Sequence, residues 1–330
     1  MKKYRVFVTR QLFDEAIDII NKEAEVEVFE GTDNPIPRDL LLTKIKDIDG
    51  LLCLLTDIID SEMIEKAKRL KVISNYAVGF NNIDVNEATK RGIYVTNTPG
   101  ILTETTADFT FALLLAVSRR IAESDRYVRM GNWKYAWGPR MFLGSDVHGK
   151  TLGIIGLGRI GKALVKRAKG FDMKVIYYDI VRDESFEKSY GVSFQNLKTL
   201  LEEADFVSVN VPLTENTYHL IGEEEISLMK KTAFLINTSR GAVIDEKKLY
   251  NALKNKLIAG AALDVFDKEP IDPDNPLLEL DNIIVTPHIA SASVETRKNM
   301  AIIAAKNLVE SLKGEEPANL VNPEAKKFRH

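Results

Sequence analysis

Three residues with chemically useful side chains each follow an apolar run in the second half of the chain. Arg240 lies in "LINTSRGAVID", Glu269 in "LDVFDKEP" and His288 in "VTPHIASAS". Near-continuous Val/Ile/Leu runs of this kind are typical of parallel strands buried on both faces. Open α/β sheets bind ligands beyond the carboxyl ends of their strands, so all three side chains are expected at one crevice.

Each residue type suits a distinct task in such a crevice. A histidine gives or takes a proton near neutral pH, and a carboxylate beside an imidazole favours its charged form and fixes the ring. An arginine offers a planar fork for a substrate carboxylate. Taken singly, however, His288 is equally well a packed core histidine, Arg240 a structural ion pair and Glu269 an ordinary loop acid.

A glycine motif precedes these residues. "GIIGLGRIGKAL" places Gly156, Gly158 and Gly161 in the spacing G-x-G-x-x-G, after the strand-like "TLGII" and before the helix-like "RIGKALVKRAKG". The first glycine permits a tight turn, the second lets the backbone approach a pyrophosphate, and the third allows close helix packing. The pyrophosphate then lies at a helix N-terminus. The motif predicts a dinucleotide site whose turn is completed by Leu157, Arg159 and Ile160.

The next apolar run, "KVIYYD", ends in Asp179. An acid at this place suits the two ribose hydroxyls of NAD and repels the 2′-phosphate of NADP. Asp179 is alternatively a solvent-facing acid at a strand end, and the nearby Arg182 leaves NADP use open. We expect NAD.

Apolar runs and amphipathic stretches alternate twice, once before residue 100 and again after about 150. The predicted fold is therefore α/β with two parallel sheets, the second domain being inserted into the first. We expect a discontinuous domain over 1–99 plus 289–330 and a nucleotide domain over 100–288. One long helix is predicted over 103–130, breaking at Gly131, with an apolar face that needs a domain or a second subunit to cover it.

Composition excludes several classes of protein. With a net charge of −3 over 330 residues, no basic field is available for nucleic acid or anionic lipid. The apolar run "FTFALLLAV" is too short to span a bilayer, and the N-terminus shows no signal-peptide core. The single cysteine, Cys53, excludes an internal disulfide and a multi-thiolate metal site. These features predict a cytoplasmic, metal-independent protein.

The motifs together resemble the D-isomer-specific 2-hydroxyacid dehydrogenase family over nearly the whole chain. The matching segments, in the family's order, are "NYAVGFNNIDV", "NTPGILTETTADFTFALLL", "GKTLGIIGLGRIG", "NVPLTENTYHLI", "LINTSRGAVIDEKKL", "AALDVFDKEP" and "TPHIASA". The resemblance implies an oxidoreductase that transfers hydride between NAD(P)H and a small 2-oxo acid. It also implies a homodimer, two Rossmann-like or flavodoxin-like domains, and an active site of Arg240, Glu269 and His288.

Further site residues are carried over from the resemblance. The backbone N–H groups of Val78 and Gly79 would hold the substrate carboxylate, and Leu54 would form an apolar wall. The implied cofactor contacts outside the glycine motif are Thr106, Val211, Pro212, Thr217, Thr238, Ser239, Asp264 and Ala290.

The segment around Trp137 is most similar to the glyoxylate/hydroxypyruvate reductase branch of the family. Met141 stands where relatives often have tryptophan, and a flexible thioether in place of a rigid indole favours a wider pocket. A larger substrate, such as the sugar-acid ketone of a 2-ketogluconate-type reductase, is therefore one alternative. A 3-phosphoglycerate dehydrogenase is a second alternative. An alternative from another class is a dimeric, corepressor-like scaffold that uses NAD to set its state.

Overall fold

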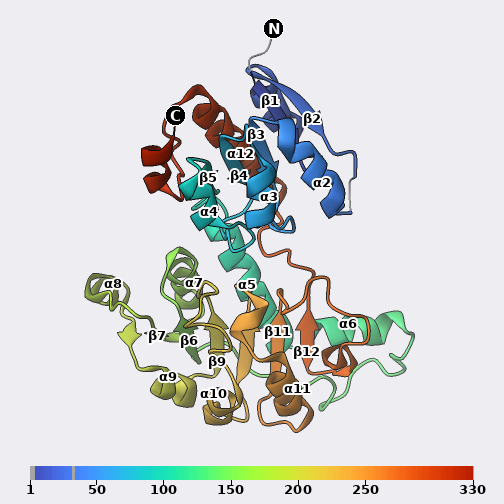
Figure 1. Cartoon of the computed structure of the whole chain (residues 1–330). Coiled ribbons are helices and arrows are strands. Elements are labelled where there is room, and N and C mark those ends of the chain that lie inside the picture. The colour runs from blue at the N-terminus through green and yellow to red at the C-terminus, as the bar shows by residue number, and fades with distance from the viewer. Residues whose placement is uncertain (1–3, 32–33, 330) are drawn as a thin grey trace. The chain divides into compact units, whose positions relative to one another are not determined.

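The computed structural model describes residues 4–31 and 34–329 and divides the chain into two compact units. One unit comprises the residues up to Leu102 together with those from Ser293 onward, and the other runs from Thr103 to Ala292. The boundaries therefore fall three and four residues after the expected ends at 99 and 288. Figure 1 gives the element labels.

The first unit is built on a parallel sheet of five strands in the order β2-β1-β3-β4-β5. The strands are β1 (Tyr4–Val8), β2 (Ala24–Val28), β3 (Gly50–Cys53), β4 (Val72–Asn75) and β5 (Tyr94–Thr96). All five coincide with apolar runs in the sequence, and this order is that of flavodoxin-like sheets.

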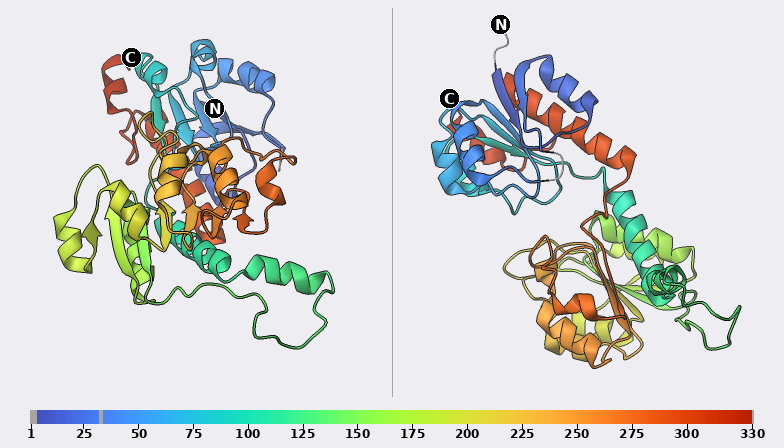
Figure 2. Two further views of the ribbon diagram at one scale, coloured as in Figure 1. Left: turned by 90° about the horizontal axis from the view of Figure 1, so that it is seen from below. Right: turned by 90° about the vertical axis from the view of Figure 1, so that its right-hand side faces the viewer.

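Helices cover both faces of this sheet. They are α1 (Asp14–Asn21), α2 (Arg38–Lys44), α3 (Ser61–Lys66), α4 (Val85–Lys90) and α12 (Val294–Lys313). Helices α1 and α12 pack side by side on one face (Figure 2). Ile20 of α1 and Leu308 of α12 belong to the same buried cluster as Val6 and Leu52 of the sheet. The C-terminal helix thus returns the chain to its first sheet.

The second unit contains a parallel sheet of seven strands in the order β12-β11-β10-β9-β6-β7-β8. The strands are β6 (Thr151–Ile155), β7 (Lys174–Tyr178), β8 (Ser193–Phe194), β9 (Phe206–Val209), β10 (Phe234–Asn237), β11 (Gly260–Leu263) and β12 (Ile283–Val285). The order reverses between β6 and β9, which makes this the topological switch point where a dinucleotide binds in Rossmann folds. Each of these strands except the two-residue β8 coincides with an apolar run in the sequence.

The helices of this unit also form two layers. They are α5 (Thr103–Ser118), α6 (Ile121–Arg129), α7 (Arg159–Lys169), α8 (Glu184–Tyr190), α9 (Leu197–Glu203), α10 (Glu223–Leu228) and α11 (Glu246–Lys254). Helices α5 and α7 cover one face of the sheet, and α9, α10 and α11 cover the other. Among the described residues, no helix is long and apolar enough to cross a bilayer.

The prediction of one helix over 103–130 is wrong. The helix ends at Ser118, and Arg120 adopts a left-handed backbone with φ of 55° before α6 begins at Ile121. The apolar side chains of α5, such as Phe111 and Leu114, pack on α7 and the sheet within the same unit. The apolar face is therefore covered without a second subunit, whereas α6 buries none of its residues.

Candidate active site

The three candidate side chains follow three adjacent parallel strands. Arg240 lies after β10, Glu269 after β11 and His288 after β12. Nδ1 of His288 is 2.7 Å from Oε2 of Glu269, and the other carboxylate oxygen, Oε1, accepts a hydrogen bond of 3.0 Å from the N–H of Phe266. The carboxylate is thus fixed at both oxygens, and it fixes the imidazole ring.

Electrostatics tie Arg240 to this pair. Burial would raise the pKa of Glu269, but the His288 ring, the N–H of Phe266 and the charge of Arg240 together hold it below its ordinary value. Burial lowers the pKa of the Arg240 guanidinium, and the charge of Glu269 opposes that effect. At neutral pH the site therefore holds an ionised carboxylate that faces an arginine and a histidine.

The backbone at His288 is held in an unusual conformation. Its φ is 55°, a left-handed value that costs an L-residue free energy. The fully buried carboxylate of Asp264 stabilises this turn by accepting hydrogen bonds from the hydroxyl of Thr286 and from the N–H groups of Ile289 and Ala290, at 2.6, 2.9 and 2.8 Å. The structure thus gives Asp264 a role in shaping the His288 turn, and its contact with a nicotinamide carboxamide stays a prediction.

Two residues that the sequence did not single out hold the Arg240 loop. Asn237, fully buried at the end of β10, donates from Nδ2 to the carbonyl of Arg240 at 2.8 Å and accepts from the N–H of Ser239 at 3.0 Å. At Gly241 a Cβ atom would lie 1.8 Å from the backbone carbon of Phe266. Gly241 therefore lets the Arg240 loop contact the segment that leads to Glu269. The "SRG" sequence, a glycine directly after the arginine, is the signal that could have revealed it.

The glycine motif has the geometry of a dinucleotide cradle. Gly156 has φ of 96°, and a Cβ there would come within 2.9 Å of Asn210 and of a methyl group of Val211. A Cβ at Gly161 would lie 2.3 Å from the carbonyl oxygen of Gly156, whereas the space around Gly158 is open within 4 Å. Gly158 also leaves the N-terminus of α7 without a side-chain cap. Such an N-terminus favours an anion.

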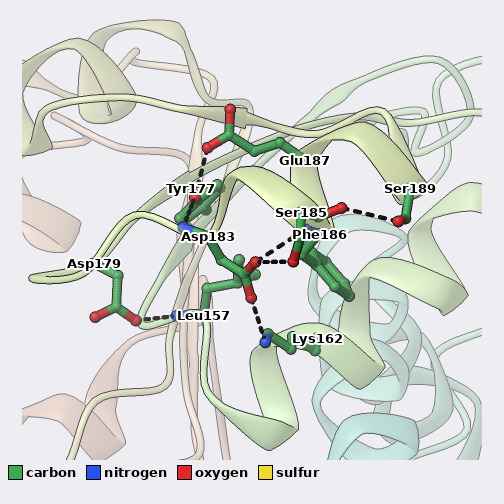
Figure 3. A network of polar contacts seen from close by, with 9 residues as sticks. All are labelled: Leu157, Lys162, Tyr177, Asp179, Asp183, Ser185, Phe186, Glu187 and Ser189. Carbon is green, nitrogen blue, oxygen red and sulfur yellow. Dashed lines mark hydrogen bonds and ion pairs between the residues drawn. The ribbon is translucent and has the colours of Figure 1, made fainter.

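Asp179 lies beside this cradle. Its Oδ2 accepts a hydrogen bond of 2.7 Å from the N–H of Leu157 in the glycine loop (Figure 3). Exposed Arg159 begins α7. Asp179 and Leu157, which are 22 residues apart in sequence, are thus in direct contact.

The other predicted cofactor residues of this unit lie in or beside the strand-end loops. Val211 lies next to the Gly156 turn. In the loop after β9, the Thr217 hydroxyl donates a hydrogen bond to the carbonyl of Pro212 and so stabilises the loop. Thr106 is buried in α5, where its carbonyl accepts from the Thr110 hydroxyl, which is in turn 2.7 Å from the hydroxyl of Thr238. Among the described residues, no group of three or more His, Cys, Asp or Glu side chains could hold a metal ion.

The predicted substrate residues Leu54, Val78 and Gly79 belong to the first unit, after β3 and β4. The carbonyls of Val78 and Gly79 accept hydrogen bonds from the side-chain amides of Asn97 and Asn75, at 2.7 and 2.8 Å. The amide of Asn82 donates to the carbonyl of Leu54 at 3.1 Å. Three asparagines thus shape the two loops at the carboxyl edge of this sheet, and the sequence had not indicated them.

We predict that Gly241→Ala destabilises the protein by about 1–3 kcal/mol, because the added methyl group collides with backbone that cannot move aside easily. Urea unfolding of the purified variant measures this. Gly138→Ala is the matched control, since a Cβ there meets only Met141, at 3.9 Å. Equal stability of the two variants would show that the Arg240 loop does not depend on close contact with Phe266.

Comparison with known proteins agrees with this geometry. Residues 111–290 match the model of the D-isomer specific 2-hydroxyacid dehydrogenase NAD-binding domain. A glyoxylate reductase of Korarchaeum cryptofilum is 57% identical over 99% of this chain and 98% of its own length. A crystal structure of a Thermus thermophilus protein superposes with a TM-score of 0.90 at 45% identity, covering 96% of this chain and 99% of the other.

Some of the solved neighbours contain a nicotinamide cofactor. The NADPH-dependent glyoxylate/hydroxypyruvate reductase of Sinorhizobium meliloti, solved with NADP and malonate, has a TM-score of 0.87 at 30% identity, covering 100% of this chain and 99% of the other. The fold, the glycine cradle and these relatives together show that the chain belongs to the D-isomer specific 2-hydroxyacid dehydrogenase family and is an oxidoreductase with a nicotinamide cofactor.

Proposed function

We propose that the protein is a glyoxylate/hydroxypyruvate reductase that uses NADH and forms a D-2-hydroxy acid. The observation that carries this proposal is the Glu269–His288 pair, 2.7 Å apart, at the strand edge that also bears the glycine cradle. The names of the relatives support the choice of a small 2-oxo acid.

The residues of the cradle fit a dinucleotide. The open space at Gly158 and the uncapped N-terminus of α7 would receive the pyrophosphate, with Arg159 adding a charge-assisted contact. The Asp179 carboxylate would bind the adenosine ribose hydroxyls. When bound, NADH supplies the hydride that reduces the substrate carbonyl carbon.

The residues of this chain would then bind the charged substrate and supply the proton that the reaction needs. Arg240 would bind the substrate carboxylate and polarise the adjacent carbonyl. His288 would donate a proton to the carbonyl oxygen as it becomes a hydroxyl. The ionised Glu269 would stabilise the imidazolium and hold the ring in place. With glyoxylate as the substrate, the aldehyde group is reduced to an alcohol: glyoxylate, NADH and one proton give glycolate and NAD⁺.

We also propose that the protein forms a homodimer through the segment that follows α5. Apolar side chains are exposed here to an unusual degree, with Tyr135 and Trp137 each 79% exposed and Met130 68% exposed. Exposed apolar side chains that lie together in one segment are typical of interaction surfaces. Since α5 is covered within its own unit, we assign the dimer contact to this later segment.

The dimer predicts a solution mass of twice 37.1 kDa. Light scattering coupled to size exclusion measures it. Val128→Asp, which places a charge on the exposed apolar face of α6, should shift the protein toward monomer. A wild-type monomer at all accessible concentrations would rule the dimer out.

We expect glyoxylate and hydroxypyruvate to be reduced with NADH, with loss of absorbance at about 340 nm, the reduced-nicotinamide band. Hydroxypyruvate should give the D-isomer, which chiral chromatography identifies. 3-Phosphohydroxypyruvate and 2-ketogluconate complete the panel, because preference for either would support one of the alternative reductases. No turnover with any 2-oxo acid, together with NADH-dependent binding of another protein, would favour the scaffold.

His288→Ala should lower kcat by roughly 10²–10⁴, the usual contribution of general acid–base catalysis, while NADH still binds. Stopped-flow kinetics and calorimetric titration with NADH separate these two effects. His148→Ala is the matched control, because the His148 side chain is 75% exposed at the amino-end side of the sheet, and it should keep full turnover. Wild-type turnover in the His288 variant would refute the proton-donor role.

A further inference from the structure

The loop between β7 and α8 borders the dinucleotide cradle directly. The N–H of Gly156 donates to the carbonyl of Tyr178 at 2.8 Å, and the N–H of Leu157 donates to Asp179 at 2.7 Å. In Rossmann folds this is where NAD and NADP are distinguished, because an acid binds the free ribose hydroxyls and a nearby arginine accommodates a 2′-phosphate. The chain has both residue types here, in Asp179 and Arg182.

Two cations that border this loop are engaged by acids of the following helix and its cap. Nε and Nη2 of Arg182 donate to the two oxygens of Glu187 at 2.9 and 3.0 Å, a two-pronged contact. Nζ of Lys162 lies 2.6 Å from Oδ2 of Asp183, which also caps α8 (Figure 3). A phosphate that approached this loop would meet two neutralised cations and the carboxylate of Asp179.

The Arg182–Glu187 contact is anchored more firmly than an ordinary surface ion pair. The Glu187 side chain is only 13% exposed, against 54% for Arg182, and its Oε1 also accepts a hydrogen bond of 2.9 Å from the hydroxyl of Tyr177. Tyr177 is fully buried, and its hydroxyl accepts from the N–H of Asp183 at 2.9 Å. Burial, together with the negative charges of Glu187 and Asp183, raises the pKa of Tyr177 to about 12, so the hydroxyl remains a donor.

We propose that Glu187 is a specificity-determining residue that makes the protein selective for NADH, by holding Arg182 in an ion pair that a 2′-phosphate would have to break. Asp179 supplies the first discrimination, by binding the ribose hydroxyls, and Glu187 supplies the second, by withholding an arginine suited to the phosphate. This inference rests on the proposed use of NADH. It adds to Asp179 a second residue, eight positions further along the chain, that acts on cofactor choice through Arg182.

The test is calorimetric titration of the full-length protein with NADH and with NADPH, without substrate. The wild type should bind NADH more tightly than NADPH by roughly tenfold or more, as expected for an acid at the ribose. Glu187→Gln should tighten NADPH binding by about three- to tenfold, the modest gain expected from a partly exposed charge-assisted contact. Its affinity for NADH should stay within about twofold, and glutamine can still accept from Tyr177.

Two further variants decide the cause. Arg182→Ala in the Glu187→Gln background should abolish the gain for NADPH, since the freed guanidinium would be its source. Glu203→Gln is the charge-matched control, because it also replaces an acid in an exposed ion pair, that of Glu203 with Lys174. Lys174 is the first residue of β7, so this pair lies at the amino ends of the strands, away from the glycine cradle. This control should leave both affinities unchanged.

The contrary outcomes separate this inference from the proposed function. Equal binding of NADH and NADPH by the wild type would overturn the selectivity and leave the reductase intact. An unchanged NADPH affinity in Glu187→Gln, or an equal gain in Glu203→Gln, would overturn the role of Glu187. Binding of neither cofactor by the wild type would overturn the proposed function, and this inference with it.

Discussion

The hydrogen bond between the Glu269 carboxylate and the His288 imidazole is the interaction on which the candidate site depends. It joins the loops after two neighbouring strands and orients the ring through Nδ1. At this turn the His288 backbone adopts a left-handed conformation, with φ of 55°. The buried Asp264 carboxylate offsets that strain through three hydrogen bonds to the same turn. The buried Asp264 carboxylate thus stabilises a backbone conformation at His288 that is unfavourable on its own.

The same principle, in which buried groups hold strand-end loops for chemistry, recurs along the carboxyl edge of both sheets. Asn237 holds the Arg240 loop, and Gly241 removes the side chain that would separate this loop from Phe266. In the first unit, buried Asn75 and half-buried Asn97 hold the Val78–Gly79 loop in the same way. Each parallel sheet places its loops at the carboxyl ends of its own strands, and these asparagine and glycine residues set the loop conformation.

Sequence patterns predicted the parts of the molecule that depend on local periodicity and on spaced motifs. The apolar runs coincide with nearly all the strands, and the glycine spacing coincides with the tight turn between β6 and α7. The break at Arg120 escaped prediction because arginine has no local preference for a left-handed backbone, and tertiary packing of α5 decides where that helix ends. The hydrogen bonds of Asp264 to the His288 turn and the ion pair of Arg182 with Glu187 could not be predicted from the sequence for another reason. Both depend on geometry that exists only after separate segments have folded together.

In the proposed reaction the ionised carboxylate of Glu269, the imidazole of His288 and the guanidinium of Arg240 act together on one 2-oxo acid. A crystal structure of the protein with NADH and oxamate, a stable analogue of such a substrate, tests this most directly. We expect Nε2 of His288 within hydrogen-bonding distance of the oxamate carbonyl oxygen, Arg240 bound to the oxamate carboxylate, and the contact between Glu269 and His288 intact. A complex in which oxamate binds without contact to His288, or in which Glu269 has released the ring, would contradict it.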